Sequence, residues 1–265
     1  MPSSPASNST RSIHEAAAQG YSRSADSYAR GRPGYPPEVV DWLRNSVGLR
    51  PGRTVVDLGA GTGKFTPRLL ETGASVIAVE PVAAMAARLS SAMPQVRTVT
   101  GTAEKIPLPD ASVDAVVCAQ SFHWFANRES LDEIHRVLVP GGRLALVWNM
   151  RDAQVGWVAR LDAIVNRYEG DAPRYYTGIW REAFPHPGFS QFDEEHFSVE
   201  HTGAPEDVIF SRVRSTSFIA ALPEAERARI DDELRALIVA EPALAGRAVV
   251  SVPYETAAFV ATRVD

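Results

Sequence analysis

The chain has 265 residues, of which 45% are hydrophobic, so it is long enough to bury a sizeable core. Its 27 Lys and Arg against 32 Asp and Glu give a formal net charge of −5, and no two of the Lys and Arg residues are adjacent, which argues against a nucleic-acid-binding face. The single cysteine, Cys118, excludes an internal disulfide bond, and no apolar run approaches the ~20 residues that span a bilayer. We therefore expect a cytoplasmic protein whose partner is neither nucleic acid nor a membrane; its oligomeric state is not predicted.

The N-terminal part shows two changes in composition. Residues 1–12 are rich in Ser and Pro without periodicity and predict a disordered lead. Residues 13–50 predict helices, including one that opens at Pro36 with a single apolar face and ends at Gly48.

Residues 51–150 alternate short apolar strands with amphipathic helices. Strands are predicted at 54–58, 75–80, 96–99, 113–118 and 143–149, with helices between them. This order implies an α/β fold with a parallel sheet and right-handed crossovers. In such sheets ligands bind beyond the carboxyl ends of the strands, so the residues that follow each strand are the first candidates for a site.

The first strand runs directly into three glycines, Gly59, Gly61 and Gly63. Glycine permits positive φ and a close approach of ligand to backbone, and the following helix directs free N–H groups at the same place. A phosphate loop is excluded, because Leu58 stands where its first Gly is needed and Phe65 where it needs a hydroxyl. The dinucleotide fingerprint is weakened because Lys64 stands where its third Gly is needed.

The remaining pattern, Asp57-x-Gly59-x-Gly61-x-Gly63, resembles the first motif of class I S-adenosylmethionine-dependent methyltransferases. Glu80 ends the second strand 23 residues after Asp57, where a carboxylate can accept both hydroxyls of a ribose. Residues 101–114 resemble the segment that passes the adenine ring in the same family. The resemblance implies a doubly wound, mostly parallel, seven-stranded Rossmann-like sheet with a helical lid insertion.

The same resemblance implies a set of residues that contact S-adenosylmethionine. Residues 28–36 are similar to the N-terminal segment of the branch that includes trans-aconitate methyltransferase, which folds over the cofactor. The implied cofactor-binding residues are Tyr28, Arg32, Asp57, Gly59, Ala60, Gly61, Gly63, Glu80, Pro81, Val82, Ala103, Glu104 and Gln120.

The acceptor side of the site is less defined by the sequence. His123 follows the fourth strand and is the one candidate general base; the alternative is that His123 and Trp124 only shape the pocket wall. A carboxylate acceptor needs no base at neutral pH, whereas a phenol, an alcohol or a protonated amine does. Further candidate substrate contacts are Tyr21, Tyr175 and Tyr176. No metal-ligand spacing is present.

The last part of the chain interrupts the alternation. Residues 151–188 are rich in aromatics and resemble the lid insertion of the family, and residues 189–265 predict strands and helices that close the fold, with an interrupted strand pair at 248–264. We expect one domain over 1–265.

The predicted function is methyl transfer from S-adenosylmethionine to a carboxylate, phenol or hydroxyl oxygen of a small molecule. Two alternatives stay open: an oxidoreductase that uses NAD(P), and a non-catalytic protein that kept the cofactor pocket.

We predict that Glu80→Ala weakens S-adenosylmethionine binding by roughly 1–3 kcal/mol, because the ribose hydroxyls lose their acceptor. Isothermal titration calorimetry measures the change. Unchanged affinity would remove Glu80 from the site.

Overall fold

The computed structural model describes residues 32–265. They divide into two compact units, each described by itself. The sheet unit comprises Gly34–Met150, Pro173–Val199 and Tyr254–Asp265, and the helical unit comprises Arg151–Ala172, Glu200–Pro253 and the described residues up to Pro33. The single domain expected from the sequence stays a prediction.

Seven strands form one sheet in the order β3-β2-β1-β4-β5-β7-β6. The β1–β2, β1–β4, β2–β3 and β4–β5 pairs are parallel, which confirms the mostly parallel α/β sheet expected from the sequence. The strands are β1 (Thr54–Leu58), β2 (Ser75–Val79), β3 (Arg97–Val99), β4 (Val113–Ala119), β5 (Leu138–Arg151), β6 (Asp193–Gly203) and β7 (Val250–Thr262).

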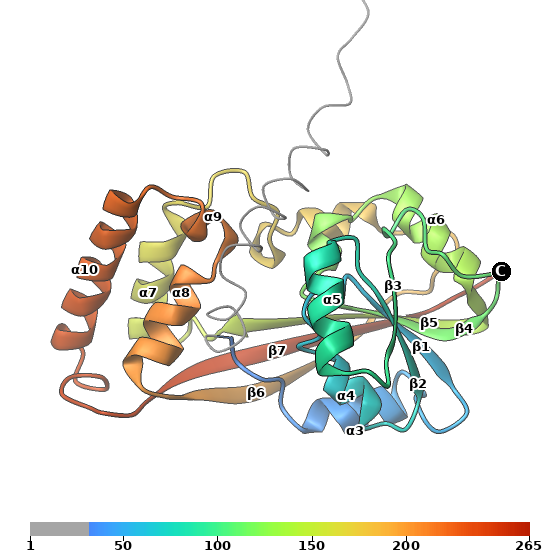
Figure 1. The fold of residues 1–265 in the computed structure, drawn as a ribbon, viewed down its shortest axis with the longest axis horizontal. Coiled ribbons are helices and arrows are strands. Elements are labelled where there is room, and N and C mark those ends of the chain that lie inside the picture. Colours follow the sequence, from blue (N-terminus) through green and yellow to red (C-terminus); the bar gives the residue numbers. More distant parts are fainter. Residues whose placement is uncertain (1–31) are drawn as a thin grey trace, which may run out of the picture. The chain divides into compact units, whose positions relative to one another are not determined.

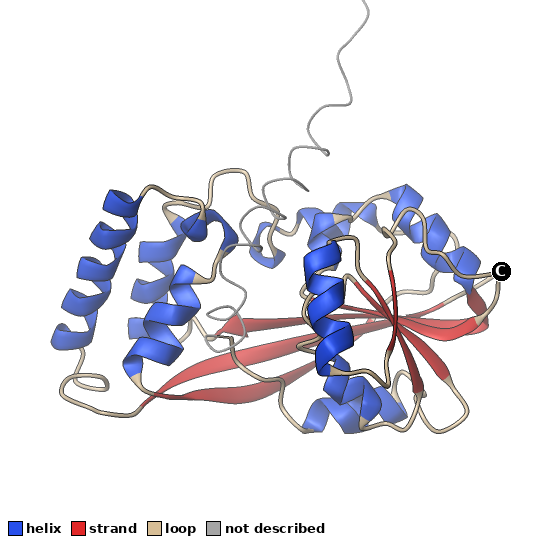
Figure 2. Ribbon diagram, viewed as in Figure 1, coloured by secondary structure: helices blue, strands red, loops and turns tan. Residues whose placement is uncertain are grey.

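Helices cover both faces of this sheet (Figures 1 and 2). Successive residues of a strand point to opposite faces, so Val56 packs in one apolar cluster and Val55 in the other. The first cluster includes residues of α6 (Arg128–Val137), and the second includes residues of α3 (Glu38–Asn45), α4 (Thr66–Leu70) and α5 (Ala83–Ala92). Burial on both faces explains why β1, β2 and β4 are almost continuous apolar runs.

The helical unit is held by packing and ion pairs. Its elements are α7 (Gly156–Asn166), a π-helix (Glu206–Ser211), α8 (Arg212–Arg214), α9 (Ser217–Ala220) and α10 (Glu224–Ala240). The helices α7 and α10 lie against each other. Inside the unit the buried Arg151 pairs with Asp162 on α7 at 2.5 Å.

The part of the chain after β5 is shared between the two units. Residues 151–172 belong to the helical unit, whereas 173–188, with short 3-10 helices at Tyr175–Thr177 and Ile179–Ala183, belong to the sheet unit. The lid insertion expected at 151–188 stays a prediction. The expected strand pair at 248–264 is one strand, β7. Pro253, which has no N–H to donate, lies within this strand, and its carbonyl accepts a hydrogen bond from the N–H of Asp152 (2.9 Å).

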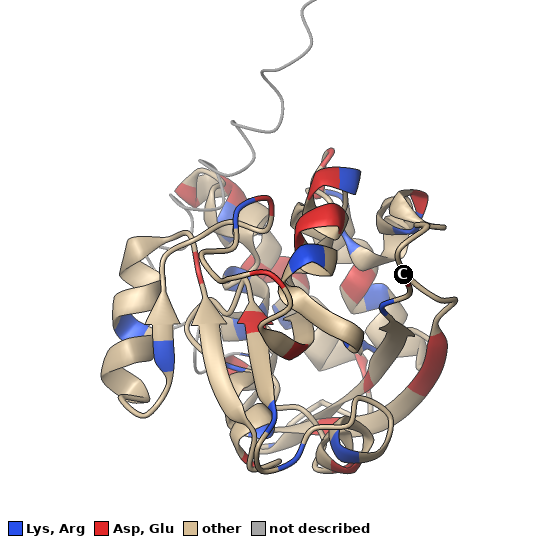
Figure 3. Ribbon diagram, turned by 90° about the vertical axis from the view of Figure 1, so that its right-hand side faces the viewer, with Lys and Arg blue, Asp and Glu red and all other residues tan. Residues whose placement is uncertain are grey.

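Among residues 32–265 the structure contains no helix that is long and apolar enough to cross a membrane. Basic and acidic residues are interspersed along the ribbon (Figure 3). The helix α6 carries charges of both signs, with Glu129 in its first turn and Arg136 in its last.

Candidate functional site

The glycine turn joins β1 to α4 at the carboxyl end of the sheet. The N–H groups of Gly59 and Ala60 both donate to the carbonyl of Val79 in β2, at 2.8 and 3.3 Å, which ties the turn to the neighbouring strand. Gly59 has φ +68°, and a Cβ there would come within 2.8 Å of the Cβ of Ser121. Position 59 therefore excludes any side chain by conformation and by contact.

Gly61 differs from Gly59 in what lies in front of it. Its φ is +59°, but the nearest atom to a Cβ built there is the Met85 Sδ at 3.9 Å. A side chain at position 61 would therefore meet no close contact, unlike one at position 59. The positive φ remains the reason for a glycine at position 61.

Glu80 links this turn to the next helix. Its Oε2 accepts a hydrogen bond from the Gly61 N–H (2.8 Å), and its Oε1 accepts one from the N–H of Val82 (2.9 Å), the N-cap of α5. The residue is only 4% exposed, and this burial raises the pKa of its carboxyl above the ordinary value. Each carboxylate oxygen keeps a second lone pair with which it can accept from a ligand hydroxyl.

Asp57 lies at the end of β1 and is almost fully buried. Burial raises the pKa of its carboxyl to about 6; the 2.6 Å hydrogen bond from Thr66 Oγ1 opposes the shift, and the Glu80 charge adds to it. Two acidic groups therefore stand at the ends of adjacent strands. Such a pair favours a ligand with cationic and hydroxyl groups.

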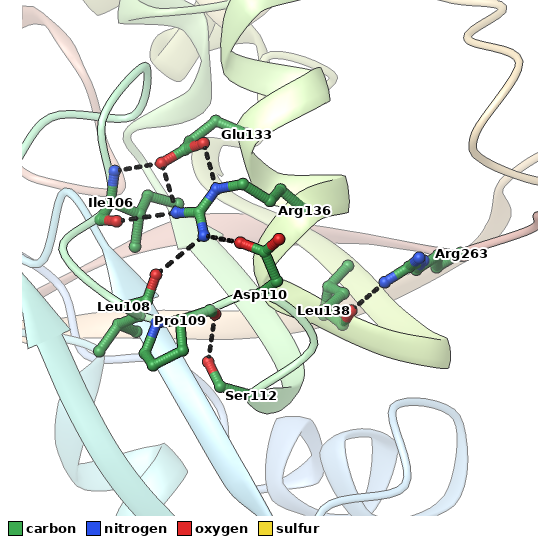
Figure 4. A network of polar contacts seen from close by, with 9 residues as sticks. All are labelled: Ile106, Leu108, Pro109, Asp110, Ser112, Glu133, Arg136, Leu138 and Arg263. Atoms are coloured by element: carbon green, nitrogen blue, oxygen red, sulfur yellow. Dashed lines mark hydrogen bonds and ion pairs between the residues drawn. The ribbon is translucent and has the colours of Figure 1, made fainter.

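The loop from Gly101 to Ser112 is fastened to α6 by one arginine, as Figure 4 shows. Arg136 donates to the carbonyls of Ile106 (3.0 Å) and Leu108 (2.9 Å), to Asp110 and, through two nitrogens, to Glu133. Glu133 in turn accepts from the Ile106 N–H (2.7 Å), and its hydrogen bonds with Arg136 hold the pKa of its carboxyl below the usual range. The position of this loop is therefore set by α6.

Two predicted cofactor residues, Ala103 and Glu104, lie in that loop. The side chain of Ala103 is buried in the apolar cluster on the α6 face, so a ligand would meet its backbone. The Glu104 carboxylate is directed at the start of α6, where it accepts from Asn127 (3.3 Å) and Ser130 (3.2 Å).

Gln120 follows β4 and hydrogen-bonds to β5. It has φ +57°, unusual for a residue with a side chain, and its amide donates to the Asn149 carbonyl of β5 (2.7 Å). Its predicted contact with the cofactor stays a prediction. Asn149, which sequence reasoning missed, donates from its amide to the Gly34 carbonyl (2.9 Å). A polar residue closing the apolar run of β5 was the signal available for it.

His123 lies in the 3-10 helix Phe122–Trp124 that follows β4. This helix is fastened over the turn because Ser121 Oγ, just before it, donates to the Leu58 carbonyl (2.7 Å). The His123 Nδ1 lies 3.1 Å from the indole Nε1 of Trp148, and the rings of His123 and Trp124 are 5.2 Å apart.

The aromatic residues predicted for the substrate separate into two groups. Tyr175 lies 5.1 Å from Trp148, ring centroid to ring centroid, so Trp148 brings Tyr175 and His123 to one place. Burial raises the pKa of the Tyr175 hydroxyl. Tyr176 is 48% exposed, with the Arg174 guanidinium 5.1 Å from its ring centroid.

Three predicted residues are not part of the sheet unit that contains the turn, as far as the structure describes them. Tyr21 and Tyr28 lie outside the described residues. Arg32 belongs to the helical unit, where it donates to the Ser215 carbonyl (3.5 Å). Their roles stay predictions. Over residues 32–265 no group of His, Cys, Asp and Glu side chains is arranged to hold a metal ion.

Comparison with known proteins gives the family. A family model described as a methyltransferase domain matches residues 56–146. An uncharacterised methyltransferase of Mycobacterium tuberculosis, Rv3342, is 43% identical, covering 89% of this chain and 92% of its own. The chain belongs to the class I S-adenosylmethionine-dependent methyltransferases.

Other methyltransferases agree with this assignment. An uncharacterised methyltransferase-like protein of Schizosaccharomyces pombe, C25B8.10, is 39% identical, covering 88% of this chain and 91% of its own. A solved structure from Anaeromyxobacter dehalogenans, described as a candidate type II methyltransferase, superimposes with a TM-score of 0.62 at 25% identity. It covers 88% of this methyltransferase and 97% of its own chain.

We predict that Arg136→Met destabilises the methyltransferase by about 1–3 kcal/mol, because the Ile106 and Leu108 carbonyls lose a charged donor. Arg128→Met is the matched control on the same helix: its pair with Asp132, at 3.7 Å, is exposed and is worth under ~1 kcal/mol. Urea unfolding measures both variants. Equal effects would show that the loop does not depend on Arg136.

The raised pKa of Asp57 predicts a pH dependence of stability. The native state keeps this proton up to about pH 6, whereas the unfolded chain releases it near the ordinary 3.8, so stability falls as pH rises through that window. The free energy of unfolding of Asp57→Asn, relative to that of wild type, should therefore rise by about 2–3 kcal/mol between pH 4 and pH 7.

Denaturant unfolding across this pH range checks the Asp57 prediction. Thr66→Val loses the hydrogen bond that favours the ionised form of Asp57. In this variant the decrease in stability should therefore extend to higher pH. If the difference in free energy of unfolding between Asp57→Asn and wild type did not change with pH, the raised pKa of Asp57 would be contradicted.

Proposed function

We propose that this methyltransferase binds S-adenosylmethionine at the turn between Asp57 and Gly63 and transfers its methyl group to a small-molecule acceptor. The observation that carries the proposal is the Glu80 carboxylate, which joins the Gly61 N–H to the Val82 N–H at the ends of β1 and β2. The glycine backbone at position 61 and the remaining lone pairs of Glu80 fit a ribose.

The residues of this site would hold the cofactor as follows. Glu80 accepts from the ribose hydroxyls, and Asp57 supplies the negative charge that favours the methionine ammonium. Pro81 and Val82 border one side of the adenine, and the backbone of Ala103 borders the other. When bound, the cofactor supplies a methyl group activated by its sulfonium.

Methyl transfer requires little acid–base chemistry from the protein. Its main tasks are to hold the acceptor in line with the methyl group and to exclude water. We assign these tasks to the segment 121–124, with His123 and Trp124, and to Tyr175. A carboxylate, phenol or hydroxyl oxygen is the proposed acceptor atom. The cytoplasmic location stays a prediction.

The test compares cofactors by thermal shift. At about a hundred times its Kd, S-adenosylmethionine or S-adenosylhomocysteine should raise the Tm by about 5–10 °C, whereas NADH should leave it unchanged. Stabilisation by NADH alone would overturn the proposal in favour of an oxidoreductase.

The same protein is then assayed for transfer of a radiolabelled methyl group. The acceptor panel contains small mono- and dicarboxylic acids, quinone-like phenols and hydroxylated natural products. Cofactor binding without transfer to any member would favour a binding protein over an enzyme.

A further inference from the structure

One hydrogen bond in the sheet unit determines the protonation of the candidate base. Trp148, on β5, is fully buried, and its indole Nε1 lies 3.1 Å from Nδ1 of the half-buried His123. An indole N–H can only donate, so Nδ1 must be the acceptor and must carry a lone pair. In the neutral imidazole the proton then resides on Nε2.

The arrangement opposes a proton on Nδ1. A hydrogen there would face the indole N–H, and the buried Trp148 donor would lose its partner in a place that water does not reach. A general base works through an unprotonated ring nitrogen, and in the Nε2–H form that nitrogen is Nδ1, which already receives the Trp148 hydrogen bond. The geometry thus does not support the general base that the sequence suggested at His123.

We propose that Trp148 is a positioning residue that keeps His123 in the Nε2–H form, and that His123 donates a hydrogen bond from Nε2 to the methyl acceptor without taking its proton. The hydrogen bond from Nε2 to the acceptor rests on the proposed methyl transfer. The Nε2–H form of His123 does not depend on it. An acceptor molecule that fits this arrangement has a hydrogen-bond-accepting atom beside the atom that is methylated. It also reacts without losing a proton to His123.

The packing around Trp148 keeps its indole in place. The Trp180 ring lies 4.6 Å and the Phe259 ring 5.8 Å from it, centroid to centroid, and Tyr175 lies against it. Trp180 is also buried, but among the described residues its indole N–H has no hydrogen-bond partner. Trp180→Phe therefore removes the same group from the same cluster without touching His123, which makes it the matched control for Trp148→Phe.

The first test is ¹⁵N NMR of the histidine side chains in the full chain at neutral pH, with His123→Gln used to assign the signal. It needs neither cofactor nor acceptor, so it stands even if the proposed function fails. We expect an Nε2 that carries hydrogen and an Nδ1 that does not. A hydrogen on Nδ1 would overturn the proposal.

The second test uses the two tryptophan variants. In Trp148→Phe the His123 signals should change to those of a ring that exchanges between its two neutral forms, whereas Trp180→Phe should keep the wild-type pattern. Retention of the Nε2–H form in folded Trp148→Phe would show that Trp148 does not determine it. If Trp148→Phe fails to fold, the wild-type spectrum still decides whether His123 is in the Nε2–H form.

The third test separates a donor from a base with the most active member of the acceptor panel. Glutamine can donate from its side-chain amide but cannot accept a proton at neutral pH. We expect His123→Ala to lower kcat/KM by roughly 100-fold and His123→Gln to recover most of that loss. Equal loss in both variants would mean that His123 removes a proton and would refute the donor role.

Discussion

The site depends on a single buried carboxylate. Glu80 is placed by β2, and its two oxygens are occupied from different directions by the N–H groups of Gly61 and Val82. Backbone N–H groups cannot be left unpaired in a buried place without cost, so the carboxylate holds the turn and the start of α5 at a defined separation. The rest of the proposed cofactor site, from Asp57 to Val82, takes its geometry from this contact.

The helix α6 sets the other border of the site. Asn127 caps its first turn and donates to Glu104, and two turns later Glu133 and Arg136 hold Ile106 by both its N–H and its carbonyl. A loop that would otherwise rely on its three buried apolar side chains, Ala103, Ile106 and Leu108, is thereby attached to a rigid element packed on the sheet. This explains how an irregular segment can present its backbone at a constant place.

The acceptor side follows a different principle, in which aromatic packing determines a polar arrangement. Trp148 donates a hydrogen bond to one ring nitrogen of His123 and lies against Tyr175. One buried indole therefore contacts both the 3-10 helix after β4 and the one that begins at Tyr175. A histidine at the end of a strand is usually considered first as an acid or base. Here its neighbour, rather than its position, decides its chemistry.

The sequence by itself determined the alternation of strands and helices, the glycine turn, and the places of Asp57 and Glu80, because those signals lie within one strand and the turn after it. The partners of Gln120 and His123 came only from the tertiary structure, since they lie 29 and 25 residues away on β5. The continuity of β7, which lies between β5 and β6 in the sheet, likewise came only from the tertiary structure. Local patterns establish which elements form, whereas the direction of a polar side chain depends on what the fold brings beside it.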